Sequence, residues 1–335
     1  MRAVVLVGGF GTRLRPLTIG TPKQMLPIVD RPMIEHVLAH LASHGIDDAV
    51  LSMGYMPDAF SSAYPDGVCA GVTLHYAVEP EPLDTAGAIR FAALDAGISE
   101  RFVVVNGDVL TDLDIGALVA FHDGHGAEGT IALHQVEDPS AFGVVPTDAD
   151  GRVTAFVEKP PRDEAPTDLI NAGTYVLEAS VLDRIADGRR VSIEREVFPA
   201  MVTEGRLYAM PSDTYWIDAG TPGQYLRAQL DLLDGHRGRS WPGVSAEAEV
   251  DLSATVERSV VAAGARVEAG AIVRDAVVLT GAVVSSGSRV EGSIVGPGAV
   301  VGEGATLADL CVLGDGSKAA PGEHLVGVRR PAPAE

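Results

Sequence analysis

The residues most suited to chemistry lie close to the N-terminus, in a glycine-rich segment that leads into a group of cations. Residues 3–7 are apolar and read as a strand that opens into this segment. Glycines allow backbone N–H groups to approach a phosphate closely, and cations complement its charge. The segment therefore predicts a phosphate-binding site. Its glycines and cations are Gly8, Gly9, Gly11, Arg13, Arg15 and Lys23.

The glycine spacing differs from that of two familiar phosphate-binding loops. No Gly-Lys-Ser or Gly-Lys-Thr follows the glycines, which excludes a P-loop of the Walker type. The glycines are also too closely spaced for the dinucleotide-binding fingerprint, and its third glycine is missing. A plain glycine turn with surface arginines is the alternative. The string Gly-x-Gly-Thr-Arg-Leu-Arg-Pro-Leu-Thr over residues 9–18, followed by Pro22-Lys23 and Leu26-Pro27, is too specific for it.

This string resembles the sugar-1-phosphate nucleotidyltransferases, the pyrophosphorylases that make nucleotide sugars, and among them the mannose-1-phosphate guanylyltransferases. The resemblance implies transfer of a nucleotidyl group from a nucleoside triphosphate to a sugar 1-phosphate, with release of pyrophosphate. Such a transfer is an in-line attack at the α-phosphorus and needs no side-chain nucleophile. The protein must hold two polyanions and neutralise the developing charge, using backbone N–H groups, Lys, Arg and carboxylates that bind Mg²⁺.

The resemblance assigns the triphosphate to the N-terminal segment. Arg13 is expected to contact the β- and γ-phosphates that leave as pyrophosphate, and Lys23 to contact the α-phosphate and the attacking oxygen. A surface lysine on a proline-bounded turn is the alternative for Lys23. The nucleotide is further expected to lie against Leu6, Gly8, Gly9, Gly11 and Thr12.

Two aspartates are expected to bind Mg²⁺. Asp108 follows an apolar strand, and Asp218 lies in Trp-Ile-Asp-Ala-Gly-Thr-Pro at a second junction between a strand and a helix. Mg²⁺ prefers one or two carboxylates together with phosphate oxygens and water, so two separated aspartates suffice. A turn or cap residue is the alternative for Asp108. Asp112 and Asp114 are predicted to begin a helix rather than to bind the metal.

Three further motifs resemble the segments of the family that bind the sugar phosphate. The backbone of Gly143 is expected to meet the sugar. Glu158 is expected to bind sugar hydroxyls and Lys159 the phosphate, although a Glu-Lys pair taken alone is more often a solvated face. Asn171 is expected to form a hydrogen bond with a further hydroxyl of the sugar.

The base-binding segment resembles that of guanylyltransferases. A carboxylate accepts hydrogen bonds from guanine N1–H and from its exocyclic amine together, which favours GTP as the nucleotide. Within the segment, Asp84 stands where the family usually has glycine. The residues expected to bind the nucleotide here are Glu79, Asp84, Thr85 and Gly87.

A second departure keeps the choice of base open. Gln24, after the expected phosphate-binding lysine, and the segment 30–33 resemble thymidylyltransferases that act on glucose 1-phosphate. Residues 85–88, the segment 192–199 (Ser-Ile-Glu-Arg-Glu-Val-Phe-Pro) and the repeats described below favour the guanylyl interpretation. A regulatory relative that binds nucleotide sugar without catalysis is a further alternative, but Arg13, Lys23, Asp108 and Asp218 are all retained.

The segment 1–234 alternates between strand-like and helix-like patterns. This alternation predicts an α/β domain with a mostly parallel, Rossmann-like sheet covered by helices. Ligands of such sheets bind beyond the carboxyl ends of the strands, where the glycine segment and Asp108 lie. The expected strands are 3–7, 48–53, 72–77 and 102–105, and the expected helices are 33–44, 85–96 and 221–233.

The pattern after residue 243 is a hexapeptide repeat. Gly264, Gly281 and Gly298 recur at a constant spacing, and the apolar triplets beginning at Ser293 and Leu310 are expected to keep that register. Such periodicity predicts a left-handed parallel β-helix. Acyltransferases with this fold usually need a histidine in the coils, and here only His324 is present. The expected domains are 1–234 (catalytic), 235–243 (linker), 244–328 (β-helix) and 329–335 (tail).

Composition and charge limit the classes of partner. The chain has 335 residues, 46% of them hydrophobic, which predicts a globular protein with a substantial core. A net charge of −21 argues against nucleic acid and anionic membranes as partners. Two cysteines without metal-ligand companions, and no leader before the first strand, predict free thiols and a cytoplasmic protein. The β-helix is expected to support a homo-oligomer.

Overall fold

The computed structural model describes residues 1–332, and its contacts divide the chain into two compact units. The first unit contains Met1–Gly9 and Ile34–Trp216. The second contains Phe10–Met33 together with the chain from Ile217 onward. The glycine-rich segment is therefore divided between the units. Its first residues, up to Gly9, belong with the sheet, and the part from Phe10 onward belongs with the C-terminal part of the chain. The sequence had placed all of it in one domain, 1–234.

The first unit is built on one mixed sheet. Its central strands run in the order β7-β1-β4-β6 and are parallel, with Val4 of β1 opposite Val50 of β4 and Val104 of β7. These valines are fully buried, as the strands of a sheet covered on both faces must be. The four strands are β1 (Arg2–Leu6), β4 (Asp48–Met53), β6 (Val72–Val78) and β7 (Phe102–Asn106).

Antiparallel strands extend this parallel centre. The strand β12 (Leu169–Leu177) pairs with β7 and with β9 (Gly129–Gln135), and β13 (Leu207–Ser212) runs parallel to β9. The expected Rossmann-like sheet is confirmed, with these antiparallel additions. The remaining strands of the unit are β5 (Val68–Cys69), β8 (Val109–Thr111), β10 (Gly143–Val144) and β11 (Val157–Glu158), and β14 (Trp216–Asp218) begins at its last residue.

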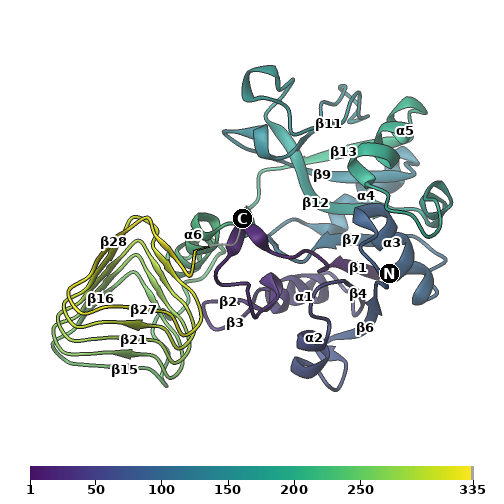
Figure 1. Cartoon of the computed structure of the whole chain (residues 1–335). Helices are drawn as coiled ribbons and strands as arrows, with labels where there is room; N and C mark the ends of the chain where they lie inside the picture. Colours follow the sequence, from purple (N-terminus) through teal and green to yellow (C-terminus); the bar gives the residue numbers. More distant parts are fainter. Residues whose placement is uncertain (333–335) are drawn as a thin grey trace. The chain divides into compact units, whose positions relative to one another are not determined.

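Helices cover the sheet (Figure 1). The helix α3 (Asp84–Asp95) packs on β1, β4 and β6, where its Ile89 joins the buried cluster around Val4. The helix α4 (Ile115–His125) packs on β9, β12 and β13 and begins where predicted, because Asp114 accepts a hydrogen bond from Ala117 N at 2.9 Å. The other helices are α1 (Met33–Ser43), α2 (Asp58–Ala63), α5 (Phe198–Thr203) and the π-helix Ile193–Val197. None of the helices in residues 1–332 has the length and apolar character needed to cross a membrane.

The C-terminal repeats form a β-helix of triangular coils (Figure 1). Each strand pairs in parallel with the strand one coil later, which gives three sheets of five strands. Valines and alanines fill the interior, together with Cys311, and neither Cys311 nor Cys69 is in a disulfide, as predicted. The first sheet contains β15 (Glu249–Val250), β18 (Arg266–Val267), β21 (Val283–Val284), β24 (Val300–Val301) and β27 (Lys318–Ala319).

The other two sheets complete each coil. The second contains β16 (Thr255–Glu257), β19 (Ile272–Arg274), β22 (Arg289–Glu291), β25 (Thr306–Ala308) and β28 (His324–Val326). The third contains β17 (Val260–Val261), β20 (Val277–Val278), β23 (Ile294–Val295), β26 (Val312–Leu313) and β29 (Arg329–Arg330).

The coil length changes near the C-terminus, which corrects two expectations. Ile294 pairs with Val312, and not with Cys311 as the constant spacing of the earlier coils predicts. The reason is an added residue at one corner, where Asp309 and Leu310 both have positive φ. In addition, β29 pairs with β26, so Arg329 belongs to the β-helix and not to a tail. Residues 333–335 of that expected tail lie outside the described residues.

The helix α6 (Pro222–Leu233) organises the rest of the second unit. Thr221 caps it by accepting a hydrogen bond from Gln224 N, which agrees with the expected helix. Its Gln229 is fully buried, donates from Nε2 to the carbonyl of Pro27 at 2.7 Å, and accepts from Val29 N at 2.6 Å. These bonds fix α6 to the hairpin β2 (Pro27–Ile28) and β3 (Arg31–Pro32) of the N-terminal segment.

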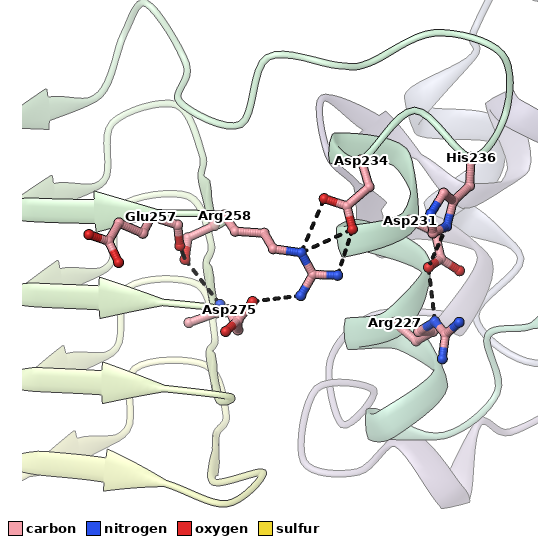
Figure 2. A network of polar contacts seen from close by, with 9 residues as sticks. Arg227, Asp231, Asp234, His236, Glu257, Arg258 and Asp275 are labelled. Carbon is pink, nitrogen blue, oxygen red and sulfur yellow. Dashed lines mark hydrogen bonds and ion pairs between the residues drawn. The ribbon is translucent and has the colours of Figure 1, made fainter.

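The end of α6 is joined to the β-helix by an ionic network (Figure 2). Arg258, at a coil corner, donates through Nε and Nη2 to the carboxylate of Asp234, with a shortest distance of 2.6 Å. Its Nη1 also donates to Asp275 at 2.6 Å, one coil later. Near the end of the helix, Arg227 and His236 both contact Asp231. The β-helix and α6 are therefore linked by charge-assisted bonds.

Candidate active site

In the first unit, the glycine-rich segment begins beside a carboxylate. Gly8 follows β1, and a Cβ atom added to it would lie 3.2 Å from Glu79 Oε1 and 3.3 Å from Gly54 N. A larger residue would therefore crowd both groups. The structure brings Gly8 and Glu79 together at the carboxyl ends of β1 and β6, as the sequence predicted for a ligand site. Leu6 is the last residue of β1, and Gly9, three residues later, is exposed.

The carboxylate of Glu79 is fixed by its neighbours. Leu83 N donates to Oε2 at 3.0 Å, and Ser52 Oγ lies 3.2 Å from Oε1. Burial raises the pKa of Glu79 above its ordinary value, and these two hydrogen bonds oppose part of that shift. A half-buried carboxylate in a fixed orientation is suited to accept hydrogen bonds from a ligand with adjacent N–H donors.

Asp84 has a backbone conformation that favours glycine. Its φ is +61°, in the left-handed region that L-residues seldom adopt and that Asp tolerates better than most. The exposed carboxylate accepts a hydrogen bond from Thr85 N at 2.9 Å. The glycine expected at this position is thus explained by the backbone, and the aspartate is held against its own helix start.

Thr85 belongs to a network that includes a carboxylate overlooked by the sequence analysis. Its hydroxyl donates to Glu194 Oε2 at 2.7 Å and accepts from Ile193 N at 2.9 Å. Ser192 Oγ donates to the same Glu194 oxygen at 2.7 Å. Glu194 lies in the π-helix, a local geometry common at functional sites. The segment 192–199 had been read only as a mark of the family, with no role for Glu194.

Packing accounts for the glycine at position 87. A Cβ atom there would lie 2.8 Å from Leu83 Cβ and 3.0 Å from the carbonyl of Arg189. Both neighbours are protein atoms, and Gly87 itself is buried in α3. The geometry therefore explains the glycine by the close approach of the segment around Arg189.

Asp108 lies in the turn that follows β7. It is 7% exposed and sits between β7 and β8, at the carboxyl end of the strand, as the sequence predicted. The same strand end carries Asn106, whose amide would be 2.5 Å from a Cβ added to Gly173. Gly173, at φ +74°, thus allows β12 to pass close to this strand end.

The expected sugar-binding residues Gly143, Glu158 and Lys159 lie together. Gly143 of β10 is paired with Glu158 of β11, and a Cβ atom added to Gly143 would lie 2.6 Å from the Phe156 ring and 3.1 Å from Glu158 Oε2. The ammonium of Lys159 is 3.1 Å from Glu158 Oε1. The glycine therefore makes room for the Phe156 ring and for Glu158, whose ion pair with Lys159 offers both a cation and an acceptor.

Asn171 is engaged inside its own strand. Its Nδ2 donates to the Tyr175 hydroxyl at 2.8 Å, and its Oδ1 accepts from Gly173 N at 2.9 Å. Burial, with a contribution from the nearby charges of Glu194 and Glu158, raises the pKa of Tyr175, so this phenol stays neutral. Asn171 thus hydrogen-bonds a buried tyrosine that had no predicted role in the site.

In the second unit, Gly11 and Lys23 are neighbours. Gly11 has φ +62°, and a Cβ atom added to it would lie 3.1 Å from Thr18 Cγ2 and 3.3 Å from Lys23 Cβ. Thr18 Oγ1 donates to the carbonyl of Gly11 at 2.7 Å. The loop folds back on itself here, which brings the first glycine turn to the lysine expected to contact the α-phosphate. Thr12 begins the short helix Thr12–Leu14 between them.

Arg13 is paired with Asp218 in the same unit. Arg13 Nη2 lies 3.5 Å from Asp218 Oδ2, and Gly220 N donates to Asp218 Oδ1 at 2.9 Å. A Cβ atom on Gly220 would lie 2.7 Å from the guanidinium, so this glycine makes room for the pair. The cation expected to bind phosphate thus contacts a carboxylate expected to bind metal. Within residues 1–332, no three side chains of His, Cys, Asp or Glu gather as a protein-only metal site.

Gln24 is buried and does not face solvent. It is 1% exposed, and its Oε1 has no hydrogen-bond partner in the described part of the chain. Gln24, the residue by which the sequence resembled thymidylyltransferases, is therefore a buried packing residue of the short helix Lys23–Met25.

Comparison with known families matches both parts of the chain. Residues 2–235 match the nucleotidyl transferase family, and residues 243–328 match the GMPPB C-terminal domain. A mannose-1-phosphate guanylyltransferase from Mycobacterium tuberculosis is 45% identical over 70% of this chain and 68% of its own length. A mannose-1-phosphate guanyltransferase from Schizosaccharomyces pombe is 40% identical over 77% of this chain and 74% of its own.

Solved structures of similar proteins cover the larger part of the chain. HddC from Yersinia pseudotuberculosis, also determined in complex with GMP-PN, is 28% identical, with a TM-score of 0.60 over 68% of this chain and 97% of its own. A Bacillus anthracis protein assigned as a glucose-1-phosphate thymidylyltransferase, in complex with sucrose, is 26% identical. Its TM-score is 0.63 over 72% of this chain and 97% of its own.

Proposed function

The chain belongs to the nucleotidyl transferase family, and on that premise we propose that it transfers a guanylyl group from GTP to mannose 1-phosphate, with release of pyrophosphate. The relatives that are 40–45% identical and carry the name mannose-1-phosphate guanylyltransferase support this choice of substrates. The Yersinia relative determined in complex with GMP-PN supports guanine as the base.

The observation that carries the choice of base is the fixed carboxylate of Glu79. Guanine presents N1–H and its exocyclic amine side by side, and one carboxylate accepts from both. Thymine presents a single N–H between two carbonyl oxygens. A carboxylate would repel these oxygens. Because Leu83 N and Ser52 orient Glu79 without using all of its lone pairs, the acceptor is preorganised.

The polyanions are proposed to be held by Arg13, Lys23 and the backbone around Gly8 and Gly11. Arg13 would leave its ion pair with Asp218 and bind the β- and γ-phosphates. Lys23 would neutralise the charge that builds up at the α-phosphate. Asp108 and Asp218 are both carboxylates, the ligand type that Mg²⁺ accepts together with phosphate oxygens. A bound Mg²⁺ would supply further neutralisation of the phosphates.

The sugar phosphate is proposed to bind at the Gly143, Glu158 and Lys159 group. The ammonium of Lys159 would bind the phosphate, and Glu158 would accept hydrogen bonds from the sugar hydroxyls. These roles require the present ion pair of 3.1 Å to open. Asn171 would present its amide to a further hydroxyl by giving up the bond to Tyr175.

The experiment is pyrophosphate release with Mg²⁺, for GTP, dTTP, UTP and ATP, each against mannose 1-phosphate and glucose 1-phosphate. GTP with mannose 1-phosphate should give the highest kcat/KM. Preference for dTTP with glucose 1-phosphate would overturn the choice of base and sugar. The absence of turnover with every pair would leave a nucleotide-sugar-binding protein without catalysis. In parallel, Lys23→Ala and Asp108→Ala should each lower kcat by ~10²-fold or more while Tm is maintained.

A further inference from the structure

We propose that the C-terminal end of the β-helix positions the phosphate-binding loop, and that Arg329 is the positioning residue. The proposal rests on the function proposed above, because it gives the β-helix a part in nucleotidyl transfer beyond assembly. All residues involved lie in the second unit.

The main evidence for this proposal is a hydrogen bond between residues that are far apart in sequence. Arg329 Nη1 donates to the backbone carbonyl of Arg13 at 3.1 Å, across a separation of 316 residues. Arg329 belongs to β29, which is paired with β26, so its backbone is part of the β-helix. A bond to the carbonyl of Arg13 limits rotation of the peptide that carries the Arg13 side chain. That side chain is 58% exposed, so little packing fixes it otherwise.

A second contact supports the same loop further along the chain. Pro16 is buried and lies against Gly314, which follows β26, and a Cβ atom added to Gly314 would be only 2.8 Å from Pro16 Cβ. Gly314 N donates to the carbonyl of Arg330 at 2.7 Å, which holds this glycine in the coil. The loop therefore rests on the β-helix through a steric fit at Pro16 and a hydrogen bond at Arg13.

The supporting residues of the β-helix are themselves held by hydrogen bonds and ion pairs. Arg330, next to Arg329, forms two hydrogen bonds with Glu323, at 2.7 and 3.0 Å, and a third with the carbonyl of Lys318. At a corner of the first coils, Arg258 fixes the β-helix to the end of α6 (Figure 2). Asp218, the partner of the Arg13 side chain, precedes that helix in the same unit. The backbone and the side chain of Arg13 are thus both held by C-terminal residues.

Loss of this support should impair the triphosphate half of the reaction. A shift of about 1 Å in a positioned group can cost ~10²-fold in rate. We expect Arg329→Ala to lower kcat/KM for the nucleoside triphosphate by ~10–100-fold. KM for the sugar 1-phosphate should stay within about twofold, because the guanidinium of Arg329 supports the loop that is expected to bind the triphosphate. Arg329→Lys, which keeps an N–H donor, should recover part of the loss.

The test compares Arg329→Ala, Arg329→Lys and Gly314→Ala with two matched controls. Arg289→Ala removes an arginine of the β-helix that donates to Glu291 at 2.9 Å. Gly124→Ala adds a methyl group where nothing lies within 4 Å. For each full-length variant we would measure Tm, both KM values, and hydrogen–deuterium exchange of the peptide over residues 10–18. The amides of Leu14, Arg15 and Leu17 are hydrogen-bonded inside this loop and should report its order.

The expected result is faster exchange of residues 10–18 in Arg329→Ala and Gly314→Ala, with the kinetic loss confined to the triphosphate and both controls unchanged. Unchanged exchange in Arg329→Ala and Gly314→Ala would overturn the coupling. Faster exchange with unchanged kinetics would overturn its role in the reaction. If the parent protein turns over no substrate, the proposed function fails, while the exchange data still decide whether the β-helix orders the loop.

Discussion

The guanidinium of Arg13 lies 3.5 Å from the carboxylate of Asp218. In this arrangement, a cation suited to phosphate and a carboxylate suited to Mg²⁺ neutralise each other. A bound phosphate would take the place of Asp218 beside Arg13, and a bound Mg²⁺ would take the place of Arg13 beside Asp218. Triphosphate and metal should therefore bind cooperatively, because either ligand frees the partner of the other.

Asp218→Asn tests this relationship. The amide oxygen can still accept from Gly220 N, so the local turn should persist, but the negative charge is lost. We expect the Mg²⁺ concentration at half-maximal rate to rise by ~10-fold or more, since Mg²⁺ relies on carboxylate ligands. The measurement is a Mg²⁺ titration at saturating substrates. Asp114→Asn is the control, because Asp114 caps α4 and asparagine caps equally well; an equal shift in that variant would refute the assignment.

Glu79→Gln tests the choice of base. Loss of a charged acceptor for two guanine donors should raise KM for GTP by ~10–100-fold, which corresponds to ~1.5–3 kcal/mol. Glu81→Gln, an exposed residue two positions later, is the control and should leave KM for GTP unchanged. Steady-state kinetics with GTP and dTTP check the prediction. An unaltered preference for GTP in Glu79→Gln would remove Glu79 from base recognition.

The raised pKa of Glu79 predicts how both KM for GTP and the stability of the fold should change with pH. Binding of guanine needs the ionised carboxylate, so KM for GTP should rise as the pH falls through a value above the ordinary glutamate pKa. The folded protein holds this proton more tightly than the unfolded chain does. The stabilisation from protonated Glu79 is thus complete below the ordinary pKa and is lost as the pH rises through the folded value. Near neutral pH, Glu79→Gln should accordingly unfold no more easily than the parent; a clear loss of stability would contradict this.

The sequence predicted those elements whose signal is local. Buried valine runs such as that around Val104 marked the parallel strands, and Asp114 marked a helix start, because burial pattern and capping are readable over a few residues. The longer coil near the C-terminus was also readable, since Gly316 and Gly322 each lie one position beyond where the constant glycine spacing places them. The apolar triplet that begins at Leu310 obscured this signal, because it fits the constant spacing of the earlier coils.

The contacts of Arg329 had no local signal. Its partner, the carbonyl of Arg13, is a backbone atom of no particular residue type, and only the packing of the β-helix on the loop brings it near. The same holds for Glu194, whose bonds to Thr85 and Ser192 depend on the π-helix. Asp84 shows a third limit, because a positive φ is a property of the folded backbone and a sequence shows only the residue that tolerates it.

Asp84 can be tested by comparing two substitutions. At φ +61°, Asp84→Ala places a Cβ atom in an unfavourable conformation, whereas Asp84→Gly does not. We expect the alanine variant to be less stable than the glycine variant by ~1 kcal/mol, measured by urea denaturation. At Asp95, the last residue of the same helix, the usual helical order should hold and alanine should be the more stable. The same order at both positions would show that the backbone of Asp84 is unstrained.

Lys159→Ala tests the sugar-phosphate site. The ammonium pairs with Glu158 at 3.1 Å, and we expect its loss to raise KM for the sugar 1-phosphate by ~10–100-fold. KM for GTP should change by less than about twofold, because a binding contact to one substrate is removed. Arg162→Ala, an exposed cation three positions later, is the control. A larger effect on GTP than on the sugar phosphate would reassign Lys159 to the nucleotide.

Arg258 combines an ionic role with a strained backbone, and two substitutions separate them. Its φ is +45°, and its guanidinium joins Asp234 to Asp275. Arg258→Ala loses the bonds and keeps the strain, whereas Arg258→Gly loses the bonds and relieves it. We expect Arg258→Ala to cost ~1–2 kcal/mol of unfolding free energy, a modest value because the side chain is 44% exposed, and Arg258→Gly to cost ~1 kcal/mol less.

Salt dependence then identifies the ionic part. The bonds of Arg258 are half exposed, so 1 M NaCl should reduce the difference between the parent and Arg258→Gly, while the difference between the glycine and alanine variants should remain, since strain is not screened. Urea denaturation at low and high salt measures both differences. Asp234→Asn should reproduce most of the ionic effect without touching the corner. If alanine and glycine at position 258 proved equally stable, the positive φ would carry no cost, and the network in Figure 2 alone would explain the arginine.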